Sequence, residues 1–228
     1  MFIVILLLFS ITPEELLLKV DEVRLPKQYE ATVLMKNHLQ DGREITYKFR
    51  GIEDRIKGSY LEVLEPSREA GRKFLLIGSN IWMYVPEIGK ALRLSARDRF
   101  LGSEFSNSDL MEGSYSKNYY AVSLDSVDNS YLLELEGKGP TSPYKRIIMK
   151  VRKSNSIPSE LKFYTLSGRL FREMVMDSIK VFEGEPHATY MKMTNVLSSE
   201  SYTEVKVLSI KSRKSIPLSL FKPENLGR

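Results

Sequence analysis

The chain offers few side chains for covalent or metal chemistry. Among its 228 residues there is no cysteine, and the only histidines are His38 and His187. These counts exclude a thiol nucleophile, a cysteine-based zinc or iron–sulfur site, a disulfide framework and a three-histidine metal site. His38 lies on the polar phase of an alternating segment and His187 begins another, so surface positions are favoured for both. No nucleophile-elbow, HExxH, phosphate-loop or dinucleotide-binding motif occurs. We therefore expect no catalytic residues, no metal and no cofactor, in a protein that is not an enzyme.

The charged side chains give only weak evidence of a catalytic or anion-binding site. Glu134 and Glu136 are better interpreted as solvated strand-end charges than as a catalytic carboxylate pair. Arg93, Arg97 and Arg99 could hold phosphate, for instance in a lipid headgroup, although a basic strand edge is the simpler interpretation. The 34 Lys and Arg exceed the 29 Asp and Glu by only five, and they are scattered. We therefore expect no nucleic acid as a partner.

The first element that could position such groups is a helix. The spacing of apolar residues predicts an amphipathic helix over residues 13–24. Thr12 is its N-cap, Pro13 suits the first helical position and Glu15 completes a capping box. Pro26 ends the element.

Beyond residue 28 the apolar residues recur with period two, which indicates β-strands. Residues 29–35 and 45–49 alternate around a hairpin signal at Asp41-Gly42. Further strands are predicted at residues 61–63, 74–77, 81–85, 90–94, 119–124, 131–136, 144–152, 160–165, 169–182, 187–196 and 202–209. Residues 95–116 alternate little, and a loop of this length in a compact domain is usually functional.

About a dozen strands with two or three helices predict an α+β, mostly β fold built on one strongly curved antiparallel sheet. The helix at residues 13–24 is only about 18 Å long at ~1.5 Å per residue, too short to cover the apolar face of such a sheet. Either the sheet closes into a barrel or an apolar groove remains for a ligand or partner. Five of the nine methionines lie in the C-terminal strands, where they would suit flexible acyl chains or simply fill a core.

The N-terminal segment suggests export. Residues 2–11 form an apolar run about half as long as a membrane span requires but typical of the centre of a secretory signal. No basic residue precedes the run and no small-x-small cleavage site follows it. We interpret residues 1–11 as a signal-peptide remnant and residues 12–228 as a single domain. A buried first strand or helical turn is the alternative.

Two longer segments carry a resemblance. Residues 74–86 read FLLIGSNIWMYVP and residues 100–110 read FLGSEFSNSDL, with Arg93 and Arg97 between them. They resemble the W-M-Y-x-P strand and the R-F-x-G-S-D/E-F-S-N-x-D-L loop of the outer membrane lipoprotein-sorting protein family, within the LolA/LolB-like superfamily. Residues 20–26, 41–43, 167–170 and 216–221 also fit, so the similarity spans about residues 13–226.

The resemblance implies an incomplete antiparallel β-barrel, a half-barrel with helices covering an apolar concave face. It also implies periplasmic, non-covalent carriage of acyl chains. On this hypothesis the strand phases predict a cavity lined by Val33, Met35, Tyr47, Phe49, Leu61, Val63, Trp82, Tyr84, Ile147, Met149, Met174, Met176, Met191 and Met193. The helix at 13–24 and the loop at 95–116 would form the lid. The predicted rim or lid contacts are Leu16, Leu17, Val20, Phe100, Leu101 and Phe105, with Arg93, Arg97 and Arg99 as possible headgroup contacts.

The sequence thus predicts a periplasmic carrier that passes the acyl chains of a lipoprotein or another lipid between membranes or a membrane transporter, with transient membrane contact. The alternative is an accessory subunit that carries no cargo and docks on a transporter through the same groove. A lipid hydrolase ranks third because no nucleophile constellation is visible.

Overall fold

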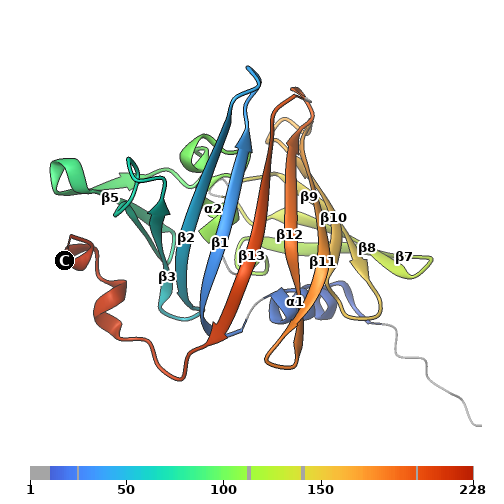
Figure 1. The fold of residues 1–228 in the computed structure, drawn as a ribbon. Coiled ribbons are helices and arrows are strands. Elements are labelled where there is room, and N and C mark those ends of the chain that lie inside the picture. The colour runs from blue at the N-terminus through green and yellow to red at the C-terminus, as the bar shows by residue number, and fades with distance from the viewer. Residues whose placement is uncertain (1–10, 25, 112–113, 140–141, 199, 228) are drawn as a thin grey trace, which may run out of the picture.

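The structure is a computed structural model that describes residues 11–24, 26–111, 114–139, 142–198 and 200–227 (Figure 1). Apart from Ile11, the segment interpreted as a signal-peptide remnant lies outside the described residues. The two α-helices are α1 (Pro13–Arg24) and α2 (Asn107–Met111). Short 3₁₀ turns lie at η1 (Pro86–Ile88), η2 (Phe100–Gly102), η3 (Leu218–Phe221) and η4 (Pro223–Asn225).

Thirteen strands of the described chain form one antiparallel sheet in the order β6-β5-β4-β3-β2-β1-β13-β12-β11-β10-β9-β8-β7. Their bounds are β1 (Gln28–His38), β2 (Glu44–Asp54), β3 (Gly58–Glu65), β4 (Lys73–Ile77), β5 (Asn80–Val85), β6 (Lys90–Leu94), β7 (Tyr119–Val127), β8 (Ser130–Gly137), β9 (Arg146–Arg152), β10 (Pro158–Tyr164), β11 (Leu170–Phe182), β12 (Glu185–Asn195) and β13 (Tyr202–Ser212). The sheet is curved and open, so the predicted half-barrel is confirmed.

The order of the strands follows from a chain of hairpins with one long-range closure. Successive strands pair with each other except β6 and β7, and β1 also pairs with β13 from Tyr29 opposite Ser212 to His38 opposite Tyr202. The first and last strands are therefore neighbours in the middle of the sheet, and its edges are the consecutive strands β6 and β7. The segment that joins these edges, residues 95–118, contains η2 and α2.

The helix α1 begins with the predicted capping box. The backbone N–H of Thr12 donates to Glu15 Oε2 (2.9 Å), and the backbone N–H of Glu15 donates to Thr12 Oγ1 (3.2 Å). These hydrogen bonds, the one from the Thr12 backbone first, lower the pKa of the exposed Glu15 carboxyl. The buried face of α1 presents Leu16, Leu17 and Val20 to the core on the concave side of the sheet.

The two faces of the sheet carry separate cores. The concave face, α1 and the segment 95–118 share the largest apolar cluster, which includes Phe49, Phe74 and Phe105. On the convex face of β2–β5, Ile52 and Leu75 pack against the C-terminal segment that contains η3 and η4. The chain end therefore acts as a strap over one half of the convex face, as the red trace beside β3 and β5 shows (Figure 1).

The turn between β2 and β3 depends on a glycine. Gly58 has a φ of +145°, and a Cβ added there would lie 2.2 Å from the carbonyl oxygen of Leu76. Gly168 has a φ of +81°, and nothing lies within 4 Å of an added Cβ. Gly58 is therefore required for both its backbone conformation and its close approach to β4, whereas Gly168 is required for conformation alone.

We predict that Gly58→Ala lowers the free energy of unfolding by about 3 kcal/mol or more. Gly168→Ala, which meets only the left-handed backbone penalty, should cost about 1 kcal/mol. Urea denaturation followed by circular dichroism measures both. Equal losses would mean that the approach of Gly58 to Leu76 does not constrain this turn.

Candidate functional site

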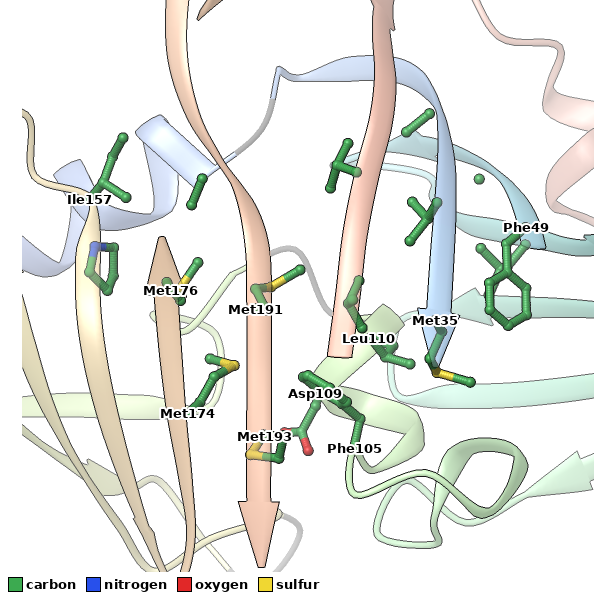
Figure 2. A pocket seen from close by; sticks show the side chains of 18 of the residues that line it. Met35, Phe49, Phe105, Asp109, Leu110, Ile157, Met174, Met176, Met191 and Met193 are labelled. Atoms are coloured by element: carbon green, nitrogen blue, oxygen red, sulfur yellow. The ribbon is translucent and has the colours of Figure 1, made fainter. Parts of the chain in front are cut away.

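An apolar cavity of about 150 Å³ lies between the concave face of the sheet and the elements that cover it. Figure 2 shows most of its lining, which comes from α1, the strands β1, β2, β3, β10, β11, β12 and β13, the residue before β10, and the segment 95–118. The lining residues are Val23, Tyr29, Ala31, Val33, Met35, Phe49, Gly51, Leu61, Phe105, Asp109, Leu110, Tyr115, Ile157, Pro158, Phe163, Met174, Met176, Ala188, Met191, Met193, Val205 and Val207.

Methionines dominate one wall of the cavity. Met174 lies opposite Met193 and Met176 lies opposite Met191 across the β11–β12 ladder, so the four side chains form two adjacent cross-strand pairs. Their sulfur atoms appear together in Figure 2. Because an unbranched thioether side chain changes rotamer easily, this wall can adapt to apolar ligands of different shapes.

Eight of the fourteen residues predicted to line the cavity do so. They are Val33, Met35, Phe49, Leu61, Met174, Met176, Met191 and Met193. Tyr47, Val63, Ile147 and Met149 lie in the same concave-face cluster but are buried in its packed part, away from the cavity lining. Strand phase therefore identifies the face, while the helices and loops above it decide where space remains.

Trp82 and Tyr84 are on the other face of β5, and this part of the predicted lining is corrected. They pack with Leu75 and the C-terminal strap on the convex side, whereas Ile81 and Met83 face the concave core. Both faces of β5 are apolar because the strap covers one and the core the other. Alternation alone could not choose between them.

The predicted rim and lid residues have several different positions. Phe105 lines the cavity, and Leu16, Leu17 and Val20 anchor α1 in the core. The contact of α1 with the cavity is instead made by Val23.

Phe100 and Leu101 hold the linking segment against the sheet. The Phe100 ring is fully buried, 4.6 Å from the ring of Phe74 and 5.6 Å from that of Phe49 between centroids. Leu101 has a φ of +47°, and its carbonyl oxygen accepts a hydrogen bond from Asn37 Nδ2 (3.1 Å).

The three arginines predicted as headgroup contacts are outside the cavity lining and contact their own chain. Arg93 donates to Asn80 Oδ1, and Arg97 donates to the carbonyl oxygen of Ser142 (3.1 Å). Arg99 pairs with Glu104 (3.1 Å). In this state they position loops, and a headgroup role for them remains a prediction.

A buried polar cluster at the inner end of the cavity was missed from the sequence. Glu104 is 2% exposed and Arg172 is 3% exposed, with 3.8 Å between Glu104 Oε2 and Arg172 Nε. Arg172 Nη1 donates to the Tyr144 hydroxyl (2.9 Å), which donates to Asp109 Oδ2 (2.7 Å). Burial, and secondarily the Asp109 carboxylate, raise the pKa of Tyr144 well above its usual value.

Asp109 is the charged residue of this cluster that also lines the cavity. The sequence did contain one usable signal. Arg172 occupies the same strand phase as Met174 and Met176, which is a buried phase of β11. A lone cation at an apolar-phase position needs a buried counter-charge, and the segment 95–118 supplies it.

The polar cluster anchors the linking segment to three distant strands. The backbone N–H of Glu104 donates to Thr203 Oγ1 (2.9 Å), and Ser201 Oγ donates to Glu104 Oε1 (2.9 Å). Thr203 Oγ1 in turn donates to Asn37 Oδ1 (3.1 Å). The segment around Glu104 is therefore fixed by directional bonds to β1, β11 and β13 as well as by apolar packing.

The helix α1 is attached to the same segment at a separate point. The carboxylate of Asp21 is buried and accepts from Ser114 Oγ (2.6 Å), the Tyr115 backbone N–H (2.7 Å) and the Ser116 backbone N–H (2.9 Å). This one side chain thus joins the two elements that cover the cavity.

Among the residues that the structure describes, no group of three or more His, Asp or Glu is arranged to hold a metal ion. None of the described helices combines the length and the apolar character that a membrane crossing requires.

Comparison with known proteins gives a consistent fold. A protein-family model described as "Uncharacterized protein" matches residues 56–228, and no curated protein matches the chain. The chain is similar to a LolA superfamily protein from Nitrosomonas europaea, with 25% identity and a TM-score of 0.84 over 94% of this chain and 99% of that one.

Two more distant structures show the same fold. An outer membrane lipoprotein-sorting protein domain from Vibrio parahaemolyticus is 19% identical, with a TM-score of 0.80 over 95% of this chain and 100% of that one. A DUF1329 family protein from Desulfovibrio piger is 20% identical, with a TM-score of 0.83 over 94% of this chain and 97% of that one.

We predict that Arg172→Met lowers the free energy of unfolding by about 3–5 kcal/mol, because it removes the buried cation beside Glu104 and Asp109 and leaves Glu104 with the half-exposed Arg99 alone. Glu104→Gln in the same chain should recover part of that loss, since the buried carboxylate that has lost this cation is then neutral. A double-mutant cycle by denaturant unfolding measures the coupling between the two side chains. Strictly additive losses would show that they do not interact.

Proposed function

We propose that this chain, which is similar to a LolA superfamily protein over 94% of its length and shares the fold of an outer membrane lipoprotein-sorting protein domain, is a periplasmic carrier of acyl chains. The cargo would be the acyl part of a lipoprotein or another lipid, passed between membranes or to and from a membrane transporter. The observation that carries the proposal is the methionine-walled apolar cavity under a two-part cover. The names of the related structures support lipoprotein sorting as the process, and the cavity supports lipid binding as the activity.

The cavity has the size expected of the protein with its cover closed over the sheet. A space of about 150 Å³ is comparable to engineered apolar cavities that hold one benzene molecule. An acyl chain of ordinary length is much larger than benzene. Loading therefore requires the cover to move away from the sheet, or the methionine side chains to rearrange, and both changes extend the space that Figure 2 shows.

The two parts of the cover are attached differently. The inner part, near Glu104 and Asp109, is fixed to the sheet by the buried polar cluster. The outer part, α1, is joined to the linking segment through Asp21. We infer that α1 is the moving part, because fewer directional bonds must break to displace it.

Release sets an upper limit on affinity. Each buried methylene contributes about 0.8 kcal/mol relative to water, and a bilayer gives the same gain. A carrier that bound its cargo much more tightly than the membrane could not deliver it. A compliant methionine wall without a close complementary fit is consistent with this requirement.

The proposal is tested by purifying the protein without detergent after export and recording its native mass with lipid extraction. We predict a reproducible adduct with the mass of a diacyl lipid or lipoprotein. Val33→Trp, which fills the cavity, should reduce bound lipid about tenfold or more, because excluding two methylenes already costs about 1.6 kcal/mol. Ala188→Phe fills the same cavity from β12 and should act in the same direction.

Leu34→Trp is the matched control, because neighbouring residues of β1 point to opposite faces and Leu34 is absent from the cavity lining. It should keep full lipid occupancy. Thermal unfolding checks that each variant is folded. Lipid-free wild-type protein that instead purifies with a stoichiometric partner protein would overturn the carrier proposal in favour of a transporter-docking subunit.

Asp21→Ala removes the carboxylate that joins α1 to residues 114–116, so α1 should open more often. We expect a labelled lipid to exchange between the protein and vesicles about tenfold faster, since hydrogen bonds to a charged group contribute about 1.5–3 kcal/mol each. Stopped-flow fluorescence measures the rate.

Glu22→Ala changes the next residue of α1, whose side chain is exposed, and should leave the exchange rate unchanged. Equal exchange rates for Asp21→Ala, Glu22→Ala and the wild type would place the moving part of the cover elsewhere.

A further inference from the structure

One end of the sheet presents four chain segments side by side. Because β1 is antiparallel to both β2 and β13, the β2–β3 turn, the start of β1, the end of β13 and the β11–β12 turn meet at the same end. We call this surface the rim and define it as residues 27–28, 54–58, 181–185 and 212–214. These strand ends lie in the lower half of Figure 1, beside α1.

Hydrogen bonds join the segments of the rim. The backbone N–H of Arg55 donates to the carbonyl oxygen of Lys27 (3.0 Å), and that of Arg213 donates to the carbonyl oxygen of Gln28 (2.9 Å). The backbone N–H of Ser212 donates to Glu183 Oε1 (3.1 Å). The rim is therefore one continuous surface.

Apolar side chains stand at both ends of the rim. Ile56, at the tip of the β2–β3 turn, is 96% exposed, and Val181, beside the β11–β12 turn, is 68% exposed. The Asp54 carboxylate holds the β2–β3 turn in shape by accepting from the backbone N–H groups of Ile56 (3.0 Å) and Lys57 (3.1 Å). Ile56 is thus presented outward by a well-bonded turn.

The charges between these two tips favour an anionic surface. The rim carries five cations, namely Lys27, Arg55, Lys57, Arg213 and Lys214. It carries three carboxylates, Asp54, Glu183 and Glu185, of which Asp54 is buried and pairs with Lys57 Nζ (3.1 Å). The other four cations therefore exceed the two remaining carboxylates. Arg213 pairs with Glu30 (2.6 Å) yet stays half exposed, so its guanidinium keeps donors for a further anion.

The rim is also continuous with the cavity. Tyr29 and Ala31, which line the cavity, lie one to three residues beyond Gln28 of the rim on β1. Val23 lines the cavity from α1, and Arg55 Nη2 donates to the carbonyl oxygen of Glu22 next to it (3.1 Å). A membrane that touched the rim would face the end of α1 that covers the cavity.

We propose that the rim docks on the surface of a bilayer that contains anionic phospholipid, with Ile56 and Val181 entering the interface and the cations contacting phosphate groups. Shallow insertion of apolar side chains together with attraction of nearby cations is sufficient for reversible membrane attachment. This inference rests on the proposed carrier function, because it names the surface through which cargo enters or leaves.

The test is co-sedimentation of the full chain with phosphatidylglycerol-containing vesicles and with phosphatidylcholine vesicles. We expect binding to the anionic vesicles that weakens with added salt, since screening acts over about 10 Å at 0.1 M. Ile56→Asp combined with Val181→Asp should weaken this binding about tenfold or more.

The matched control is Leu166→Asp combined with Leu197→Asp. These leucines are 54% and 65% exposed and lie in the β10–β11 and β12–β13 turns, at the opposite end of the sheet. The control should bind vesicles like the wild type. Failure of the wild type to bind anionic vesicles, or equal effects of the two double variants, would overturn the proposal.

Lipid content measured on the same preparations separates this proposal from the carrier function. A rim variant that keeps its bound lipid but loses vesicle binding supports both. Wild-type protein that holds lipid but does not bind vesicles would overturn the docking proposal for the rim and leave the carrier function intact. Vesicle binding by a protein that never holds lipid overturns the carrier function and, with it, the purpose assigned to the rim.

Discussion

The pairing of β1 with β13 is the constraint on which the site depends. It places the two ends of the sheet-forming chain in the middle of the sheet, so that the edges are β6 and β7, which follow each other in sequence. The segment between them must then travel from one edge of a curved open sheet to the other. It does so over the concave face, where it supplies Phe105, Leu110 and Tyr115 to the cavity. Its lack of alternation is the sequence signature of that role, since it pairs with no strand along most of its length.

Apolar contact alone would not fix this segment in place. Burial of apolar surface is favourable but non-directional, and a smooth concave face allows many positions for a loop. The Glu104–Arg172 pair, together with Tyr144 and Asp109, selects one of them. Burying these charges carries a desolvation cost that the ion pair and its hydrogen bonds offset only in good geometry. We therefore infer that the cluster fixes the position of the segment 95–118 rather than adding to the stability of the fold.

The parts of the structure that were predictable from sequence are those that local chemistry determines. The capping box at Thr12 and Glu15, the turn at Asp41-Gly42 and the alternation of β1 and β2 each leave a local signal. Trp82 and Tyr84 were assigned to the wrong face because β5 is covered on both sides, once by the core and once by the C-terminal strap.

The sequence also could not predict which residues of the concave face line the cavity. Met149 and Met193 share a face, yet only Met193 borders the cavity, because that outcome depends on the covering elements.

The distribution of rigidity follows from the same topology. The inner half of the cover is held by groups from β1, β11 and β13, which are themselves joined through long ladders. The outer half, α1, precedes β1 in the chain and contributes no strand, so its position rests on one apolar face, on Asp21 and on the hydrogen bond from Arg55 to the Glu22 carbonyl oxygen. A cavity closed by a fixed wall and a separable helix can open at one end without loss of the sheet. On the proposed carrier function, that end lies beside the strand ends that carry Ile56 and the neighbouring cations, so an acyl chain would leave the protein next to the proposed membrane-docking rim.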